Sequence, residues 1–188
     1  QLFAILAVFM VEPDDRDLVK RCLAGDLRAF ETLLERYQKP VFNIALRVLS
    51  NTDDAADVTQ ATFVKAYEKL TSYDSRYKFF SWIYRIAVNT SLNFLEQKKR
   101  SDLLGDEEVS EGNRLEEELH AAERVEKLED AILNLALEYR VVIVLRHFHD
   151  LSYEEMGMIL DIPEKTVKSR LFTARQLLKD LLTKSGLM

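Results

Sequence analysis

The 188-residue chain has few cysteines, glycines and prolines, and little of the alternating pattern that is typical of β-strands. It contains one cysteine, Cys22, which excludes an internal disulfide framework and is consistent with a reducing compartment. Only five glycines and three prolines are available to interrupt helices. No long segment alternates polar and apolar residues with a period of two. We therefore expect no substantial β-sheet.

Long hydrophobic runs are also scarce. The first eleven residues are nearly all apolar, but they are too few to span a bilayer and lack the basic flank of a secretory signal. We expect no membrane insertion. Residues 1–15 stay unassigned, either as an upstream extension or as an extra helix packed on the body.

Apolar residues at three- and four-residue spacing are abundant, and this period is typical of helices. We predict an all-α fold of two small helical domains, the C-terminal one containing a helix-turn-helix. The predicted helices of the first domain are Asp17–Leu23, a long helix capped by Asp26 and ending at Leu49, one from Asp53 or Asp54 to about Leu70, and Phe79–Lys99. Those of the second are Ala122–Leu135, Glu138–His149, Ser152–Leu160 and Pro163–Leu182.

Charge is distributed unevenly. Residues 101–130 hold 12 acidic against three basic residues, a balance of −9, so the rest of the chain, whose total is −6, carries +3. Residues 101–121 also have few large apolar groups. Such a segment cannot bury much apolar surface, so we predict a flexible acidic linker there. The asymmetry indicates modules with different partners.

The segment 151–175 is typical of a helix-turn-helix. Ser152 and Glu155 are spaced to form a capping box, and Pro163, which lacks an N–H, suits the opening of a second helix. Apolar residues at helical spacing give the two helices a shared buried face. The other face of the second helix carries cations and hydroxyls that suit a major groove: Lys165, Lys168, Ser169, Arg170, Thr173 and Arg175. The alternative is a helical hairpin with a solvated basic face.

An aromatic and basic block lies at residues 73–94, where seven aromatics are interleaved with cations. Rings beside cations suit unstacked bases of a single strand. Most of these aromatics have helical spacing and are expected to be packing residues. The better candidates for contact with DNA are Tyr73, Arg76, Lys78, Arg85 and Asn89.

Other chemistry finds little support. His147 and His149 lie two residues apart and point to different sides of a helix, so with Asp150 they do not favour zinc; we read them as helix-end histidines that favour the C-terminal dipole. We find no phosphate-binding glycine loop, nucleophile elbow or paired catalytic carboxylates, and expect neither a cofactor nor an enzyme. Cys22 is interpreted as a packing residue.

Four ordered blocks resemble the extracytoplasmic-function (ECF) sigma factors of bacterial RNA polymerase, over about residues 16–184. The blocks are Gly25-Asp26 with Ala29-Phe30 and Arg36-Tyr37; Asp54-Ala55-Ala56-Asp57-Val58-Thr59-Gln60-Ala61-Thr62-Phe63-Val64-Lys65-Ala66-Tyr67; Phe80-Ser81-Trp82-Ile83-Tyr84-Arg85-Ile86-Ala87-Val88-Asn89-Thr90; and Leu151-Ser152-Tyr153-Glu154-Glu155 with Thr166-Val167-Lys168-Ser169-Arg170-Leu171.

The resemblance implies a cytoplasmic sigma factor with region 2 at 16–100, the linker at 101–121 and region 4 at 122–184. Implied partners are core polymerase, through its β′ clamp and β flap, promoter DNA and an anti-sigma factor. Asp57, Gln60 and Phe63 would contact the clamp. Tyr73 to Lys78 and Asn89 would capture a flipped base of the −10 element. The −35 helix would use Lys168, Ser169, Arg170, Phe172 and Thr173.

Three positions depart from the family's usual residues. Ala56 stands where an acid is frequent, Ala136 where Pro is common and Gly157 where Ala is common. Small residues at the last two positions are compatible with packing. The main alternative is a stand-alone helix-turn-helix regulator whose N-terminal module senses a ligand or dimerises.

Overall fold

A computed structural model describes residues 13–102 and 119–187. Within these ranges all regular elements are helices, which confirms the all-α prediction. The apolar residues 1–11 and most of the acidic segment lie outside the described residues. The elements are α2 (Asp15–Leu23), α3 (Leu27–Leu49), α4 (Thr52–Glu68), the short 3-10 helix η1 (Leu70–Ser72), α5 (Phe79–Asp102), α6 (Leu119–Leu133), α7 (Leu137–His147), α8 (Tyr153–Leu160) and α9 (Glu164–Lys184).

Side-chain caps mark the starts of α3 and α4, and the cap of α4 differs from the predicted one. Asp26 caps α3 as predicted, because its Oδ1 accepts from the Arg28 N–H at 3.1 Å. Helix α4 is capped by Asn51 rather than by Asp53 or Asp54. Asn51 has an extended backbone and its Oδ1 accepts from the Asp54 N–H at 2.9 Å. The two aspartates instead lie in the first turn, where carboxylates favour the helix dipole.

Helices α2 to α5 form one packed unit around the long helix α3, which contacts α2, α4 and α5. Its inward face, including Leu33, Val41 and Ile44, is fully buried. The hydroxyl of Tyr37 donates to Asp15 at 2.5 Å and ties α3 to α2. This burial of apolar side chains at helical spacing is the main stabilising contribution in the unit.

Helices α6 to α9 form a second unit around α7. Five consecutive α7 residues, from Val141 to Leu145, are buried, because α6, α8 and α9 all contact this short helix. Helix α9 is much longer and packs on it through Val167, Leu171 and Ala174. The long α9 therefore has one face in the core and another outside.

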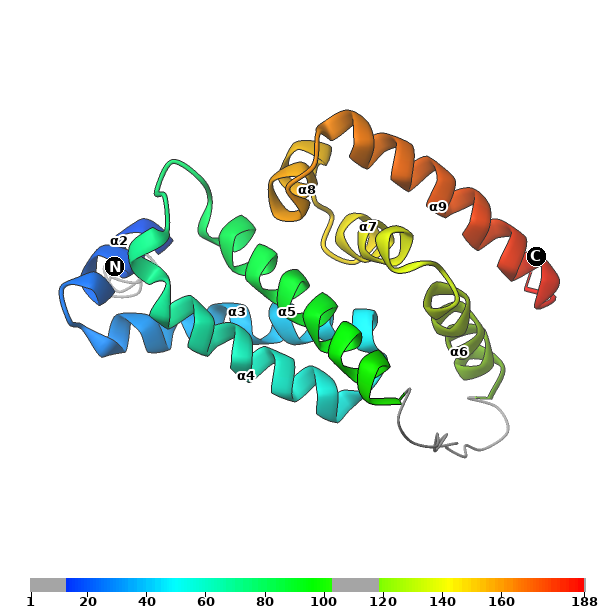
Figure 1. Cartoon of the computed structure of the whole chain (residues 1–188), viewed down its shortest axis with the longest axis horizontal. Coiled ribbons are helices and arrows are strands. Elements are labelled where there is room, and N and C mark those ends of the chain that lie inside the picture. The colour runs from blue at the N-terminus through cyan, green and yellow to red at the C-terminus, as the bar shows by residue number, and fades with distance from the viewer. Residues whose placement is uncertain (1–12, 103–118, 188) are drawn as a thin grey trace, which may run out of the picture.

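The two units pack against each other. Helix α5 contacts α8 and α3 contacts α7, and one apolar cluster continues from Leu18 in α2 to Ala174 in α9. Figure 1 shows the blue-to-green helices beside the yellow-to-red ones. The predicted linker 101–121 is helical at both described edges, since α5 runs to Asp102 and α6 begins at Leu119. No described helix combines the length and the hydropathy needed to cross a bilayer.

Candidate nucleic-acid interface

The turn between α8 and α9 has the predicted capping box. Ser152 Oγ accepts from the Glu155 N–H at 3.2 Å, and the Glu155 carboxylate accepts from the Ser152 N–H at 2.9 Å. Asp161 follows α8 with a φ of 57°, a left-handed conformation that Asp tolerates better than most residues. Pro163 flanks α9, which begins one residue later than predicted, at Glu164. Two short-range signals therefore place the helix-turn-helix correctly.

Gly157 makes this turn tight. A Cβ built on Gly157 would lie 2.9 Å from the carbonyl oxygen of Ile162, closer than Cβ atoms are found in real proteins. The same turn is closed by a hydrogen bond from the Ile162 N–H to the Gly157 carbonyl, 3.1 Å long. The glycine is thus matched to the close approach of the two helices, and the alanine that the family commonly carries would require the turn to shift.

The predicted DNA-reading face of α9 is largely exposed. Phe172 is 67% exposed, which is unusual for a large aromatic side chain. Thr173 and Arg170 are half-buried at the edge of this face. The remaining predicted contact residues are exposed: Lys165, Lys168, Ser169 and Arg175. All seven predicted residues therefore lie on one helix, outside the buried stripe of Val167, Leu171 and Ala174.

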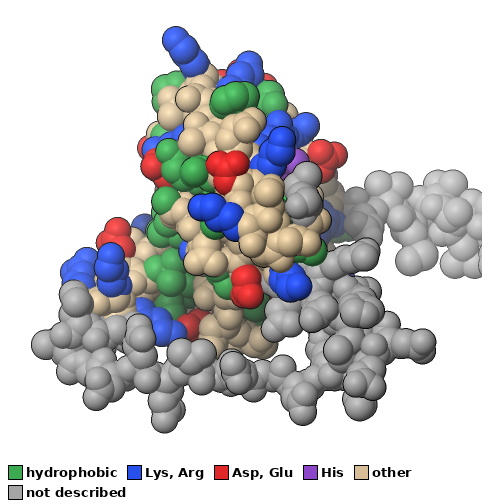
Figure 2. All heavy atoms as spheres, turned by 90° about the vertical axis from the view of Figure 1, so that its right-hand side faces the viewer, with side chains coloured by type: hydrophobic (Ala, Val, Ile, Leu, Met, Phe, Trp, Pro, Cys, Tyr) green, Lys and Arg blue, Asp and Glu red, His purple; other side chains and the backbone are tan. Residues whose placement is uncertain are grey.

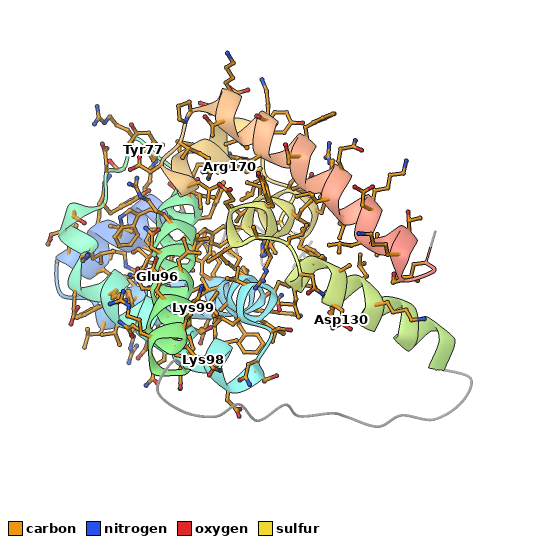
Figure 3. All side chains as sticks on the ribbon, turned by 45° about the vertical axis from the view of Figure 1, so that its right-hand side comes forward. Tyr77, Glu96, Lys98, Lys99, Asp130 and Arg170 are labelled. Carbon is orange, nitrogen blue, oxygen red and sulfur yellow. The ribbon has the colours of Figure 1, made fainter. Side chains whose placement is uncertain are left out.

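Several of these cations already have partners within the chain. Arg170 pairs with Glu138 of α7 at 2.9 Å and lies between α9 and the inner helices (Figure 3). Lys168 pairs with Glu164 at 2.5 Å, and Arg175 Nε donates to His147 at 3.3 Å. DNA would have to compete for Arg170 against a partly shielded ion pair. No local pattern indicates Glu138, which lies 32 positions away in the sequence.

Basic side chains form no continuous patch on the face in Figure 2. Lys and Arg side chains are scattered over it together with acidic ones. On this face the cations are interspersed with carboxylates, so their fields partly cancel.

A second predicted surface lies at the start of α5, around a hollow of about 520 Å³. Tyr73, Arg85 and Asn89 line it, as predicted from the aromatic and basic block. Arg76 and Lys78 do not line the hollow; both are exposed, and Arg76 forms an ion pair with Asp74 at 2.5 Å. The structure thus brings three of the five predicted residues together at one concave site.

Tyr73 has a double role at this hollow. Its ring packs edge-on against Phe79, with centroids 5.4 Å apart, and its hydroxyl donates to the Tyr77 carbonyl at 2.7 Å. Burial raises the pKa of the Tyr73 phenol. The hydroxyl is therefore held in place as a neutral donor, while the ring lines the hollow with its centroid 5.5 Å from that of Trp82.

Three further residues line the hollow, and two of them were not indicated by the sequence. Tyr77, on the loop before α5, is 50% exposed and stands at the loop's outer tip (Figure 3). Met158 and Asp161 come from α8, in the other unit, and also line the hollow. Tyr77 falls within the segment from Tyr73 to Lys78 that the resemblance implied, whereas no local pattern indicates the two residues of α8.

A third surface is an apolar groove of about 930 Å³ between α3 and α4. Gln60 and Phe63 line it as part of the predicted clamp contact, although Phe63 is only 6% exposed. Asp57 is exposed on α4 but does not line the groove. The largest exposed apolar side chains there, Val64 and Tyr67, were not predicted, because their helical spacing resembles that of core residues.

The paired histidines behave differently from the prediction. Burial, with Arg47 nearby, lowers the pKa of His149 to about 4, and burial, with Arg175 and Arg146 nearby, also lowers the pKa of His147. His147 lies in the last turn of α7 as predicted, whereas His149 lies beyond the helix end, and burial of both rings opposes the charged form that the helix dipole would favour. Among the described residues no group of three or more metal-binding side chains occurs.

Comparison with known proteins follows the same division of the chain. The family model "Sigma-70 region 2" matches residues 33–101, and "Sigma-70, region 4" matches residues 125–178. The chain is 36% identical over 178 residues to the ECF RNA polymerase sigma-E factor of Haemophilus influenzae, covering 88% of this chain and 94% of that one. It is 33% identical over 174 residues to the ECF RNA polymerase sigma factor SigW of Bacillus subtilis, covering 86% and 92%.

A solved structure is similar over both units. The complex of CnrH with the cytosolic domain of CnrY contains a chain with a TM-score of 0.70 and 26% identity. The similarity covers 90% of this chain and 97% of that one. The likeness extends across both helical units.

Proposed function

Because the chain belongs to the ECF sigma factors of the sigma-70 family, and thus directs core RNA polymerase to promoters, we propose how its described surfaces divide that work. Residues 16–100 bind core polymerase and read and melt the −10 element. Residues 122–184 read the −35 element, and residues 101–121 link the two. Bond-making chemistry belongs to the polymerase. The factor acts in the cytoplasm, with the polymerase.

Helix α9 enters the major groove of the −35 element. The observation that carries this role is the exposed ring of Phe172 among exposed cations and a serine, on the face opposite the buried stripe. An apolar ring on such a helix suits the methyl group of thymine, while Lys165 and Lys168 suit phosphate or guanine. The capping box and the tight turn at Gly157 fix the angle at which α9 is presented.

The hollow at α5 holds a base extruded from the −10 element. Asn89 offers a donor and an acceptor at its rim, and the ring of Tyr73 offers a stacking surface. Stacking of a base on an aromatic ring is worth about 1–3 kcal/mol, comparable with the few kcal/mol needed to unstack the base. Arg85 supplies a cation for the adjacent phosphate. Binding the single strand better than the duplex then drives strand opening.

Core polymerase binds across the groove between α3 and α4. The half-exposed Val64 and Tyr67 give this groove the apolar centre of a protein interface, and Gln60 lies at its edge. The carboxylate of Asp57 lies outside the groove as a rim charge. A rim charge acts mainly on the association rate and on salt dependence.

A protein inhibitor is a further proposed partner. CnrH, which resembles this chain over both units, forms a complex with the cytosolic domain of CnrY. We expect an anti-sigma factor to compete with polymerase for this chain. We assign this contact to the apolar groove between α3 and α4, which has a volume of about 930 Å³.

A variant pair on α5 tests the proposed melting site. Asn89→Ala should reduce open-complex formation by holoenzyme on linear promoter DNA, while affinity for core polymerase stays unchanged. Asn93→Ala is the matched control, because Asn93 is exposed one turn later on the same helix and does not line the hollow. Equal open-complex formation by the two variants would move the base-binding site elsewhere.

A further inference from the structure

Two ion pairs join the proposed −10 surface to the helix-turn-helix. Lys78 Nζ lies 2.9 Å from Glu155 of α8, and an Arg85 guanidinium nitrogen lies 2.7 Å from Asp161 just after α8. The partners are 77 and 76 positions apart in sequence. Both cations belong to the set proposed for −10 DNA, so in this arrangement acidic side chains take positions that phosphates would occupy.

Helix α8 also covers part of the base-binding hollow. Met158 and Asp161 line the same hollow as Tyr73 and Asn89. A DNA strand laid along this hollow would meet α8 unless the two units separated. The ion pairs and the covering side chains therefore act on one site.

The other two surfaces stay open in the same arrangement. Phe172 on α9 is 67% exposed, and Lys165 is exposed beside it. Val64 and Tyr67 in the α3–α4 groove are about half-exposed. The packing of the units thus obstructs one of the three proposed surfaces and spares the two that would meet duplex DNA and polymerase.

Contacts away from the hollow hold the units together without using DNA-binding residues. Arg140 of α7 donates to the Val48 carbonyl at the end of α3, 2.7 Å away. The ring of His149 lies edge-on to Tyr84 of α5, with centroids 5.5 Å apart. These contacts hold the two units together in an arrangement in which α8 and the two ion pairs lie over the hollow.

We propose that the free factor is closed by α8, whose acidic edge masks the −10 surface, and that −10 reading requires this contact to break. The inference rests on the proposed −10 function of α5. Side-chain exposure is 68% and 19% for Lys78 and Glu155, and 43% and 76% for Arg85 and Asp161. Pairs this exposed are weak, each shifting an equilibrium by up to about fivefold, so the closed state is reversible.

The test removes the acidic charges and keeps the local geometry. In Glu155→Gln/Asp161→Asn, the glutamine can still accept from the Ser152 N–H, and asparagine tolerates the left-handed φ of residue 161. The control, Asp150→Asn/Glu154→Gln, removes two charges from the same unit. Asp150 also has a left-handed φ and Glu154 is exposed, but neither forms one of the two pairs to α5.

The probe is a fluorescein-labelled pool of random-sequence single-stranded 12-mers, titrated onto the free full-length chain and followed by anisotropy. The Glu155→Gln/Asp161→Asn variant should bind about threefold to tenfold more tightly than the control variant. Its radius of gyration in small-angle X-ray scattering should also be larger. Equal affinity and equal radius in the two double variants would overturn the proposal.

A parallel titration separates this inference from the proposed function. Holoenzyme made with wild-type chain, Asn89→Ala or Asn93→Ala is titrated with the same pool. If Asn89→Ala binds as well as Asn93→Ala, the −10 assignment fails and the inference fails with it. If Asn89→Ala binds more weakly but the two charge variants of the free chain behave alike, the masking by α8 alone is refuted.

Discussion

Replacing Gly157 with alanine sets two effects of known size against each other. In a helix interior, alanine is about 1 kcal/mol more favourable than glycine. In this chain, however, the added Cβ would lie 2.9 Å from the Ile162 carbonyl oxygen, and ordinary contact begins about half an ångström farther away. The obstructing atom is backbone in the α8–α9 turn, so relief requires the two helices to move apart.

We expect the steric cost to exceed the gain in helix propensity. Overpacking a tight site typically costs about 1–3 kcal/mol, so the net loss after the gain in helix propensity is up to about 2 kcal/mol. For a chain of this size, a loss of about 2 kcal/mol corresponds to a fall of roughly 4–8 °C in the melting temperature. Affinity for a −35 duplex should fall as well, because α9 is presented through this turn.

Differential scanning calorimetry of the full chain measures the effect, with Glu154→Ala as the control. Glu154 is exposed on the same helix, so an alanine there changes the helix propensity without any steric clash. Its replacement should change the free energy of unfolding by less than about 0.5 kcal/mol. If Gly157→Ala melts at or above the wild-type temperature with unchanged −35 affinity, the turn tolerates the side chain and the close approach does not require glycine.

Three further predictions concern the other surfaces. Asp57→Arg should slow association with core polymerase and change its salt dependence, whereas Glu31→Arg, an exposed reversal on α3 outside the groove, should not; equal rates in stopped-flow mixing would remove Asp57 from the interface. Lys165→Ala should weaken binding to duplexes of all sequences and reduce the slope of log K against log salt by about 1, while Lys184→Ala at the end of α9 leaves the slope unchanged; a loss confined to one base pair would instead indicate base reading. Burial lowers the pKa of His149 to about 4 in the folded chain, below its ordinary value near 6.5. The unfolded state therefore binds more protons between these two pH values, and wild-type stability should fall as the pH drops from about 6.5 to about 4. If the urea midpoint of His149→Phe fell with pH as steeply as that of the wild type, His149 would not be the cause.

Local signals predicted the helices and the helix-turn-helix well. Asp26 and Ser152 cap the expected helices, and the buried stripe of α9 follows its apolar period. At α4 three neighbouring residues were all good caps, and backbone conformation decided in favour of Asn51. Spacing alone could not choose among them, because each can accept from a nearby backbone N–H.

Contacts across the chain were beyond prediction from local patterns. Glu138 beside Arg170 and Asp161 beside Arg85 come together only when whole helices dock. An exposed aromatic such as Tyr67 has the same period as a core residue, and its exposure depends on which helix covers it. The sequence therefore indicated which residues carry DNA chemistry, while tertiary packing determines which of them are accessible in the free chain.

Permanganate footprinting shows whether this chain opens promoter DNA together with core polymerase. A linear promoter recovered by selection with bacterial core polymerase and this chain is probed for unpaired thymines with both components, with each alone, and with Asn89→Ala in place of wild type. Reactive thymines are expected at the −10 element only when core polymerase and the wild-type chain are both present, and they should be clearly reduced with Asn89→Ala. A chain that binds its duplex without core polymerase and yields no reactive thymines with it would instead be a stand-alone regulator.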